Sequence, residues 1–566
     1  MQIDLVKWQH RLMYLVGDAV LLAWLPKYLK FQRNLENPLR QQKKKLLAIL
    51  KDHKDTAFGK KYGFGEIQTI SQFQNRVPIN DYESMRPYIN RIIQGEKNVL
   101  TYQEPFFFST TSGTTGEPKY IPITTDFEKE YNDRIWLFTL LRTYPRIGYF
   151  NSILAIVSQK SDEVTAGGIP CGSHSHRTYG QQSRLIQSVY ALPPEVFAID
   201  DWYARYYTIL RLSVEKPVRI LLATHPNSLL TLAQKADEVK DCLIRDVEKG
   251  TLEPGLPLPS SLRRPLERHL FPNPRRAARL RRSMVTSGGR LLPSAVWPTL
   301  EAIVCWIDGS ARFYKSQLEE KYRLPIHNLG YLATEGRGSI PVTFDGTDVL
   351  AIHLHFFEFI PEDEILKRDK SVLTCDQLEA GKFYYILFTA SNGLYRYFIN
   401  DVVYVSGFYK KTPVIRFAFK GGNVSSLTGE KIYETHVENA MARAQRRIGA
   451  TIVDYTAIPC LATPPFYRVA VEFPEPEQQR LKENLARELD RELLKENISY
   501  RRMRDARILG ELEVAALPPG TFERFIKFRV NAEGAPYSQI KISHLNPGLS
   551  FLKFLESQSI IPDADS

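Results

Sequence analysis

The stretch FFFSTTSGTTGEPKYIPIT, which begins at Phe106, combines residue types that bind phosphate oxygens. Gly113 and Gly116 let the backbone turn sharply and bring N–H groups close to a ligand. Lys119 adds a positive charge. Hydroxyl donors lie along the same stretch, at Ser109, Thr110, Thr111, Ser112, Thr114 and Thr115. Backbone N–H groups, hydroxyls and one cation together predict a phosphate-binding loop.

This loop follows neither of the common glycine-rich patterns. The Walker pattern needs four residues between its glycines and a lysine directly after the second. Here two residues separate the glycines, and Lys119 comes three residues after Gly116. The GxGxxG pattern is absent as well. A Ser/Thr/Gly hairpin tip that binds no ligand remains the structural alternative.

Two more stretches carry residues that could complete a nucleotide site. In NLGYLATEGRGSIPV, Tyr331 can stack on a flat base, Thr334 can bond a phosphate and Glu335 can hold Mg²⁺. In LYRYFINDVVYV, Asp401 stands between two predicted strands. Its carboxylate could accept hydrogen bonds from both ribose hydroxyls, and a simple turn aspartate is the alternative.

The elements around these stretches predict a mixed fold. The chain is expected to be helical up to about Lys60, and VRILLATHPNSLLTLAQKADEV predicts a buried strand, a turn and a helix. From Lys382 to Gly421, short aromatic and β-branched runs predict a ribbon of antiparallel strands. After Gly429 a helical stripe, the strand FYRVAVEF and leucines at positions 481, 485, 489 and 493 predict a smaller α+β domain. The domain boundary is expected between residues 427 and 428.

The composition is that of a globular protein. The chain has 566 residues, of which 43% are hydrophobic and 24% charged, which excludes a disordered or collagen-like chain. The net charge of +12 suits anionic partners without selecting one. The arginine-rich stretch RRPLERHLFPNPRRAARLRRSM lacks interleaved aromatics, so an exposed helix face is expected there and no nucleic-acid partner. Five scattered cysteines without a CxxC pair indicate a reducing compartment, and we expect a cytoplasmic protein.

Three weaker patterns call for structural interpretations. LMYLVGDAVLLAWL, residues 12–25, is too short to span a bilayer and is interrupted by Asp18. We expect an amphipathic helix packed on the body, with a signal peptide or surface anchor as the alternative.

Cys171, His174 and His176 have too few neighbouring ligands to predict a metal site. His353 and His355 alternate, which predicts one face of a strand. No GxSxG elbow supports a serine hydrolase.

Taken together, three motifs resemble those of the Gretchen Hagen family of auxin-responsive acyl-acid amido synthetases, which are adenylate-forming enzymes. SGTTGEPKYIP resembles that family's phosphate loop, YLATEG its second motif and YRYFINDVV its third. FEFIP, NVSSLTGEK and YSQIK extend the likeness from about Leu46 almost to the C-terminus. TGEK stands where plant members have a different hinge, which points toward a bacterial-type member.

The resemblance implies an α/β fold with α+β elements. A large N-terminal adenylate-forming domain, residues 1–427, would contain sheets and a β-barrel-like part, and a smaller mobile C-terminal domain would span residues 428–566. ATP and Mg²⁺ are implied. Phosphate would be bound by Ser112, Gly113, Thr114, Thr115 and Lys119. The adenine and α-phosphate region would be lined by Tyr331, Thr334, Glu335 and Gly336, with Glu335 nearest the metal.

The resemblance also assigns Asp401 to the ribose and Lys541 to the nucleotide, to which the C-terminal domain would deliver it. At two positions the sequence departs from the family's motifs. Lys420 stands where the family often has an arginine that could form a bidentate fork. Lys541 lacks the plant-type Pro-Arg that follows the family's lysine.

The implied reaction joins a small carboxylic acid to an amine, expected to be an amino acid, through an acyl-adenylate. An acyl-CoA ligase, which shares the first half-reaction and uses a thiol acceptor, is the alternative enzyme. A non-catalytic nucleotide-binding or membrane-surface protein is the alternative from another class, and membrane contact is the lesser expectation. The motifs leave open which acid and which amine react and how the chain oligomerises.

Overall fold

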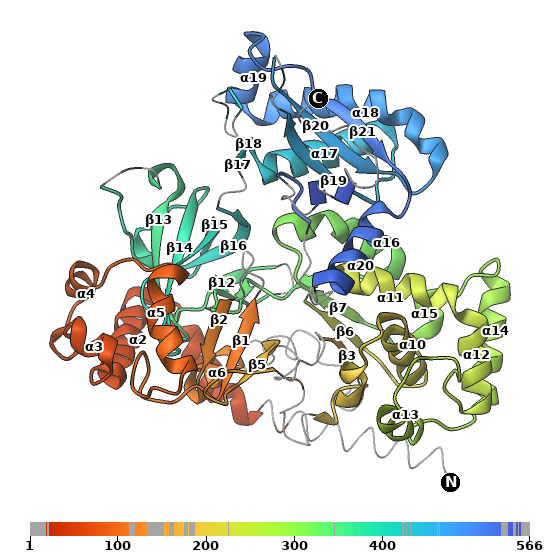
Figure 1. The fold of residues 1–566 in the computed structure, drawn as a ribbon, viewed down its shortest axis with the longest axis horizontal. Helices are drawn as coiled ribbons and strands as arrows, with labels where there is room; N and C mark the ends of the chain where they lie inside the picture. The colour runs from red at the N-terminus through yellow and green to blue at the C-terminus, as the bar shows by residue number, and fades with distance from the viewer. Residues whose placement is uncertain are drawn as a thin grey trace. The chain divides into compact units, whose positions relative to one another are not determined.

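The computed structural model shows two compact units within one chain. It describes residues 19, 22–111, 119–133, 135, 152–157, 163–174, 179, 187–224, 226–343, 346–365, 367, 369–421, 424–425, 427–428, 430, 432–460, 462, 464–533, 542–546, 551–552 and 554–555. Unit 1 comprises residues 1–399 and 403–416, and unit 2 comprises residues 400–402 and 417–566. The boundary expected between residues 427 and 428 stays a prediction. Helices and sheets are mixed, as the motifs implied (Figure 1).

Unit 1 contains a parallel sheet with the strand order β3-β6-β7-β8 (Figure 1). Its strands are β3 (Ile153–Ile156), β6 (Ile220–Ala223), β7 (Ala302–Cys305) and β8 (Ile326–Asn328). The strand, turn and helix predicted from residue 218 onward are confirmed as β6 and α11 (Pro226–Glu238). β3 and β7 are buried throughout, as expected of parallel strands covered by helices.

A second sheet of unit 1 has the order β2-β1-β5-β4 and carries the ends of the hydroxyl-rich loop. Its strands are β1 (Phe107–Thr111), β2 (Lys119–Ile123), β4 (Glu163–Val164) and β5 (Pro170–Gly172). β1 and β2 are antiparallel, and Thr111 lies opposite Lys119. The two ends of the loop are therefore directly paired with each other in the sheet.

The strand-rich segment predicted between residues 382 and 421 belongs to a six-stranded sheet of the order β11-β12-β16-β15-β14-β13. The strands are β11 (Ser339–Pro341), β12 (Asp348–Leu350), β13 (Phe356–Pro361), β14 (Phe383–Thr389), β15 (Tyr397–Tyr409) and β16 (Thr412–Lys420). β15 and β16 are joined by a tight turn in which Lys410 has a φ of 56°. Residues 400–402 of β15 and 417–420 of β16 belong to unit 2.

The described helices of unit 1 surround these sheets. They are α2 (Pro38–His53), α3 (Ala57–Lys61), α4 (Ile70–Arg76), α5 (Tyr82–Ile93), α6 (Thr125–Tyr131), α10 (Trp202–Ser213), α11, α12 (Lys240–Lys249), α13 (Ser260–Glu267), α14 (Pro274–Thr286), α15 (Pro293–Val296) and α16 (Lys315–Tyr322). α2 begins where Asn37 accepts a hydrogen bond from the Arg40 N–H, with Pro38 in the first turn. It buries Leu46, Ile49 and Leu50, and the helices predicted up to about Lys60 are confirmed for the described residues from 22 onward.

Unit 2 is an α+β structure around the sheet β19-β20-β21. The strands are β19 (Asp454–Cys460), β20 (Phe466–Glu472) and β21 (Glu513–Leu517), and a short pair is formed by β17 (Val424–Ser425) and β18 (Ile432–Tyr433). The helices are α17 (Glu434–Ile448), α18 (Lys482–Glu496), α19 (Ile498–Asp505) and α20 (Thr521–Glu533). α18 buries Leu485, Leu489 and Leu493, which confirms these three leucines of the predicted stripe as core, whereas Leu481 precedes the helix and is half-buried.

Most of the predicted N-terminal amphipathic segment, residues 12–25, lies outside the described residues. Within the described part, Leu22 is exposed. In the part of the chain that the structure describes, no helix combines the length and hydrophobicity needed to cross a bilayer.

Candidate functional site

The second motif forms a tight turn in unit 1. β9 (Leu332–Ala333) pairs antiparallel with β10 (Gly336–Arg337), and Gly336 lies opposite Ala333. Thr334 and Glu335 are therefore the two residues of the turn. Glu335 is only 8% exposed, which is unusual for a carboxylate and costs free energy unless a cation or hydrogen-bond donors compensate. Carboxylate oxygens are the donors that Mg²⁺ prefers, so Glu335 fits the role predicted for it.

Tyr331 is held by the backbone of the same motif. Its N–H donates to Ser339 Oγ at 2.8 Å, and its carbonyl accepts from the Gly338 N–H at 2.9 Å. The ring lies directly on Gly338, where a β-carbon would come 2.1 Å from Tyr331 Cδ1. The ring is 1% exposed and meets Phe388 edge-on at 6.1 Å between centroids. Gly338 is thus required by packing, while the contact of Tyr331 with adenine stays a prediction.

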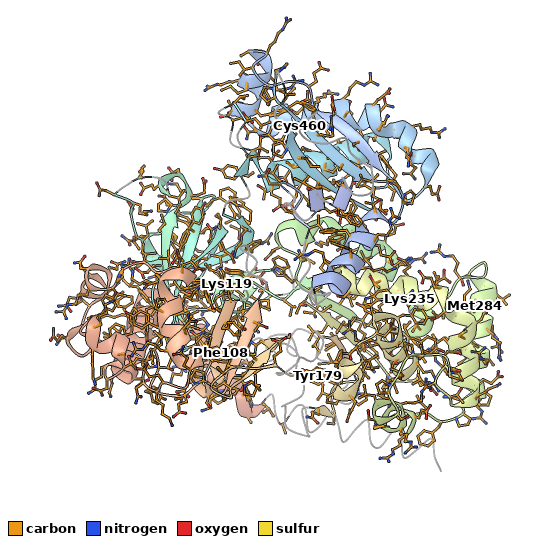
Figure 2. The ribbon with its side chains drawn as sticks, in the orientation of Figure 1. Phe108, Lys119, Tyr179, Lys235, Met284 and Cys460 are labelled. Atoms are coloured by element: carbon orange, nitrogen blue, oxygen red, sulfur yellow. The ribbon has the colours of Figure 1, made fainter. Side chains whose placement is uncertain are left out.

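The hydroxyl-rich loop is positioned by the hairpin of β1 and β2. Ser112, Gly113, Thr114 and Thr115 lie outside the described residues. Lys119, at the start of β2, is labelled in Figure 2. Its Nζ lies 5.5 Å from the centre of the Tyr82 ring, and Tyr82 Oη accepts a 2.7 Å hydrogen bond from the Tyr120 N–H. This cation–π contact holds the Lys119 side chain at the end of the loop.

In unit 2, the third motif places two of the predicted residues together. Asp401 lies in β15 and Lys420 at the end of β16, and Lys420 Nζ donates to Asp401 Oδ1 at 2.8 Å. The Asp401 side chain is 8% exposed and that of Lys420 is 44% exposed. Asn400, which precedes Asp401, has a φ of 65°, and its carbonyl accepts from the Gly421 N–H. The pairing gives Lys420 a definite contact that the sequence did not predict.

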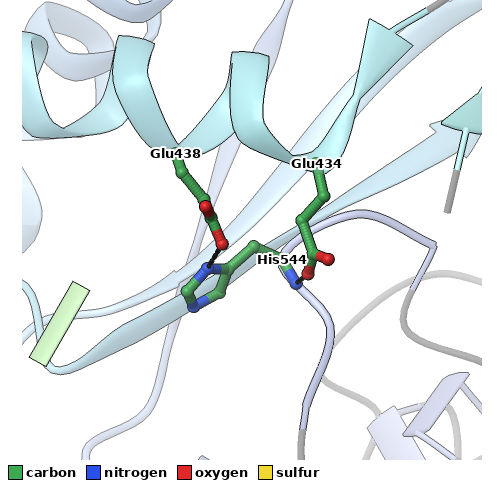
Figure 3. Close-up of side chains that lie close together, drawn as sticks. All are labelled: Glu434, Glu438 and His544. Atoms are coloured by element: carbon green, nitrogen blue, oxygen red, sulfur yellow. Dashed lines mark hydrogen bonds and ion pairs between the residues drawn. The ribbon is translucent and has the colours of Figure 1, made fainter. Parts of the chain in front are cut away.

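Lys541 lies outside the described residues, but the segment that follows it is anchored in unit 2. The Ala457 N–H of β19 donates to the His544 carbonyl at 2.9 Å, and the Asn546 N–H donates to Ala457 O at 3.0 Å. The His544 side chain carries a second anchor (Figure 3). Its Nδ1 lies 3.1 Å from Glu438 Oε1 and its Nε2 lies 3.2 Å from Asp454 Oδ1.

His544 is a buried cation among carboxylates. Burial by itself lowers the pKa of His544, but hydrogen bonds to Asp454 and Glu438 outweigh it and raise the pKa to about 10. The ring stacks on Tyr455 at 4.2 Å between centroids, and Glu434 accepts the His544 backbone N–H. With Glu438 and Asp454 on its two ring nitrogens, His544 forms a buried ion-pair network in unit 2.

Sequence reasoning missed Arg337, which directly follows Glu335 and Gly336. Arg337 is 4% exposed, its Nε donates to the Tyr131 carbonyl at 3.3 Å, and its guanidinium carbon lies 5.7 Å from the centre of the Tyr131 ring. Burial lowers the pKa of Arg337 to about 10. Its position inside the second motif was the feature of the sequence that could have identified it as a candidate site residue. A fixed cation therefore lies two residues after the candidate metal ligand in the sequence.

The two alternating histidines lie in a turn before β13, and the prediction of a strand there is wrong. Both rings nevertheless lie beside the end of α6. His353 Nε2 is 3.3 Å from Asp133 Oδ2, and His355 Nδ1 is 4.0 Å from Glu130 Oε2. Burial, with the nearby Lys45 ammonium, holds the pKa of His355 well below its usual value. Because the Arg337 N–H donates to His355 Nε2, that nitrogen is unprotonated.

The other histidine pattern of the sequence, Cys171, His174 and His176, is described only in part. The His174 ring lies 4.5 Å from that of Tyr131, which places His174 against the end of α6. His176 lies outside the described residues. Within the described residues, Glu434, Glu438 and His544 are the candidate ligand cluster, and Cys171 and His174 are not part of one.

The arginine of the third motif has a structural contact that the sequence also missed. Arg396 Nε donates to Glu358 Oε2 at 3.0 Å, and its Nη1 donates to the carbonyls of Gln74 and Val77 at 2.7 Å. Arg396 and Glu358 are 5% and 1% exposed. Glu358 comes from the FEFIP stretch, so this buried pair joins two of the quoted motifs to α4.

Sequence profiles of one family match most of the chain, in order. The GH3 family N-terminal domain matches residues 27–323, the central domain residues 348–420 and the C-terminal domain residues 435–547. Curated relatives include a jasmonoyl–L-amino acid synthetase of Oryza sativa subsp. japonica, 26% identical over 94% of this chain and 96% of that protein. An indole-3-acetic acid-amido synthetase of Arabidopsis thaliana is 23% identical over 92% of this chain and 91% of that protein.

Solved structures show the same fold. The GH3.15 acyl acid amido synthetase in complex with 2,4-DB aligns with a TM-score of 0.82 at 22% identity, over 94% of this chain and 95% of that one. A 2-hydroxyisobutyryl-CoA ligase in complex with 2-HIB-AMP aligns with a TM-score of 0.54 at 11% identity, over 91% of each chain. The fold is therefore that of the adenylate-forming enzymes, with a large N-terminal and a smaller C-terminal domain.

Proposed function

The chain belongs to the GH3 family, and from that membership we propose that it is an ATP-dependent acyl-acid amido synthetase. It activates a small carboxylic acid as an acyl-adenylate and passes the acyl group to the amino group of an amino acid. The observation that carries the proposal is the ordered match of all three family domains to a chain that keeps the motif residues Glu335 and Asp401. Relatives named for auxin and jasmonate conjugation support the class of acid and amine.

The first half-reaction makes the carboxylate a good acyl donor. A carboxylate oxygen attacks the α-phosphorus of ATP, the bond to the β-phosphate oxygen breaks, and pyrophosphate leaves. Positive groups near the phosphates favour this step because negative charge accumulates around phosphorus. We assign this role to Lys119, to the N–H and hydroxyl donors of residues 112–115 and to Lys541.

The second half-reaction forms the amide. The amine nitrogen attacks the acyl carbon, AMP leaves with the electrons of the acyl–oxygen bond, and the nitrogen loses a proton. We assign the ribose to Asp401, whose carboxylate Lys420 orients from 2.8 Å. Adenine and the α-phosphate would contact Tyr331, Thr334 and Gly336.

Mg²⁺ would be held by Glu335 together with phosphate oxygens, and when bound it supplies charge neutralisation for the leaving pyrophosphate. The protein contributes the position of that carboxylate. The turn between β9 and β10 fixes the Glu335 backbone, and its low exposure limits competition from water. The cytoplasm, with its ATP and free amino acids, is the compartment we propose.

The decisive experiment is ATP–pyrophosphate exchange with a panel of carboxylic acids and no amine. Acid-dependent exchange would establish adenylation and identify the acid. An acceptor panel containing amino acids and coenzyme A then separates an amido synthetase from an acyl-CoA ligase. The absence of exchange with every acid, in a folded protein that binds ATP, would contradict the proposed function.

A further inference from the structure

The helix α14 presents a row of arginines on its outer face. Arg275, Arg279 and Arg282 are spaced by four and three residues, so they lie along one side of the helix. All three are exposed, and none forms an ion pair with any residue that the structure describes. The sequence from residue 268 to residue 290 contains no aspartate or glutamate. We call these three residues the arginine face.

The rest of α14 explains why the arginine face is not needed for folding. Ala277 and Leu280 are buried on the opposite side, where α14 packs against α12 (Figure 1). Arg276 donates to three backbone carbonyls between 2.8 and 2.9 Å, and Arg281 pairs with Glu248 of α12. These two arginines hold the helix in place, whereas those of the arginine face make no such contacts.

Apolar side chains flank the arginine face. Phe271, in the loop before α14, is 71% exposed, and Val285, in the last turn, is 80% exposed. Pro272 and Pro274 follow Phe271, so the backbone that carries the ring is stiff. Met284, which is labelled in Figure 2, marks the same end of α14 as Val285. Basic side chains attract anionic lipids, and exposed apolar side chains near them in the sequence can add apolar area that is buried on binding.

The spacing of like charges supports an external anionic partner. Guanidinium groups three and four residues apart repel each other, and an anionic surface removes that repulsion. An aromatic row that could stack nucleic-acid bases is absent from α14, whose sequence is PRRAARLRRSMVT. The apolar flanks also favour a surface that has a nonpolar layer beneath its charges.

We propose that the arginine face, with Phe271 and Val285, binds the anionic surface of a lipid bilayer. The arginines contact lipid phosphate and carboxylate groups, and the two apolar side chains enter the interface. Contact of this kind keeps the enzyme in solution at high salt and at the bilayer at low salt. The inference does not depend on the amide-forming reaction.

The test is sedimentation of the full-length protein with phosphatidylcholine vesicles, with and without about one-third phosphatidylserine, which is enough for a strong negative surface potential. The triple variant R275Q/R279Q/R282Q removes the arginine face. Its partition onto anionic vesicles should be about a hundredfold weaker than that of the parent protein, since each basic group near such a surface contributes about fivefold. Phe271→Ser should weaken binding at all salt concentrations, because its contribution is apolar.

The matched control removes the same charge elsewhere. Arg480, Arg502 and Arg507 of unit 2 are exposed and form no ion pair with a described residue, so R480Q/R502Q/R507Q lowers the net charge equally. Binding that is lost in both triple variants alike would overturn the proposal, because only general charge attraction would remain. Absence of binding to anionic vesicles would overturn it as well. A third outcome would also overturn the proposal. In it the parent protein binds a short DNA duplex in a salt-sensitive way but does not bind vesicles, and only R275Q/R279Q/R282Q loses the DNA binding.

Discussion

Lys420 Nζ and Asp401 Oδ1 lie 2.8 Å apart, where the last residue of β16 meets the third motif in β15. The lysine is nearly half exposed, so the pair contributes little to stability, on the order of 1 kcal/mol or less. Its significance is orientation. We propose that Lys420, by binding one carboxylate oxygen, orients Asp401 toward the ribose.

The first prediction concerns the charge of Asp401. Asp401→Asn should lower kcat/KM for ATP by about a hundredfold, because two hydrogen bonds to a charged acceptor are weakened. The melting temperature should change little. ATP–pyrophosphate exchange and thermal unfolding measure the two quantities, with the exposed Asp376→Asn as the control. Near-normal exchange would remove Asp401 from the ribose site.

Lys420 gives a second and separate prediction. Lys420→Arg should keep exchange within about threefold of the parent, because a guanidinium can reach the same carboxylate and restores the residue that the family often has. Lys420→Met should raise KM for ATP more than it lowers kcat, since it loosens Asp401 without removing it. If both variants behave alike, the Lys420 contact has no role in nucleotide binding.

The third prediction concerns Glu335, the buried carboxylate in the turn of the second motif. Glu335→Gln keeps the shape of the side chain but removes the charge that would bind Mg²⁺. Exchange should fall by about a hundredfold or more, and the Mg²⁺ concentration that gives half-maximal rate should rise. The melting temperature should change little, because glutamine keeps the size of the side chain.

The control for this experiment is Glu320→Gln, on the exposed face of α16. It should leave both the rate and the Mg²⁺ dependence unchanged. A Glu335→Gln protein that keeps the parent's Mg²⁺ dependence would mean that another residue binds the metal.

Much of the fold could be predicted because it depends on local patterns. The strand, turn and helix of β6 and α11, the strands between residues 382 and 421, and the leucine face of α18 all follow from periodicity. His353 and His355 were assigned to a strand because alternation alone does not distinguish a strand from an irregular turn. Both side chains are placed by α6, more than two hundred residues earlier.

The tertiary partners of the site residues could not be predicted from the sequence, because they lie far apart along the chain. Arg396 and Glu358 are 38 positions apart, and His544 and Glu438 are 106 apart. Each pair forms only because two separately recognisable elements pack together. The sequence identified Asp401 and Lys420 singly, but it held no signal that one would contact the other.

The buried pair Arg396–Glu358 gives the fourth prediction. Arg396→Met leaves the Glu358 carboxylate buried without its cation, and burial already raises the pKa of that group. Unfolding should become easier by about 3 to 5 kcal/mol. The double variant R396M/E358L should recover a large part of this loss, because it removes both charges. Chemical denaturation measures each value, and equal stability of single and double variants would contradict the argument.

The fifth prediction concerns pH and the buried imidazolium of His544. The pKa of His544 is raised from 6.5 to about 10 in the folded protein, so the folded state binds the proton more tightly than the unfolded state. The stabilisation is therefore complete below about pH 6.5 and is lost progressively as the pH rises toward 10. Over that window each pH unit removes up to about 1.4 kcal/mol.

Denaturant unfolding of the full-length protein between pH 6 and pH 10, followed by circular dichroism, measures this loss of stability. His544→Gln keeps two hydrogen-bonding groups but cannot carry the charge. It should be less stable than the parent at pH 6.5, because Glu438 and Asp454 lose the cation between them, and the difference should shrink toward pH 10. A difference that stays constant across the window would show that His544 contributes by packing on Tyr455 alone.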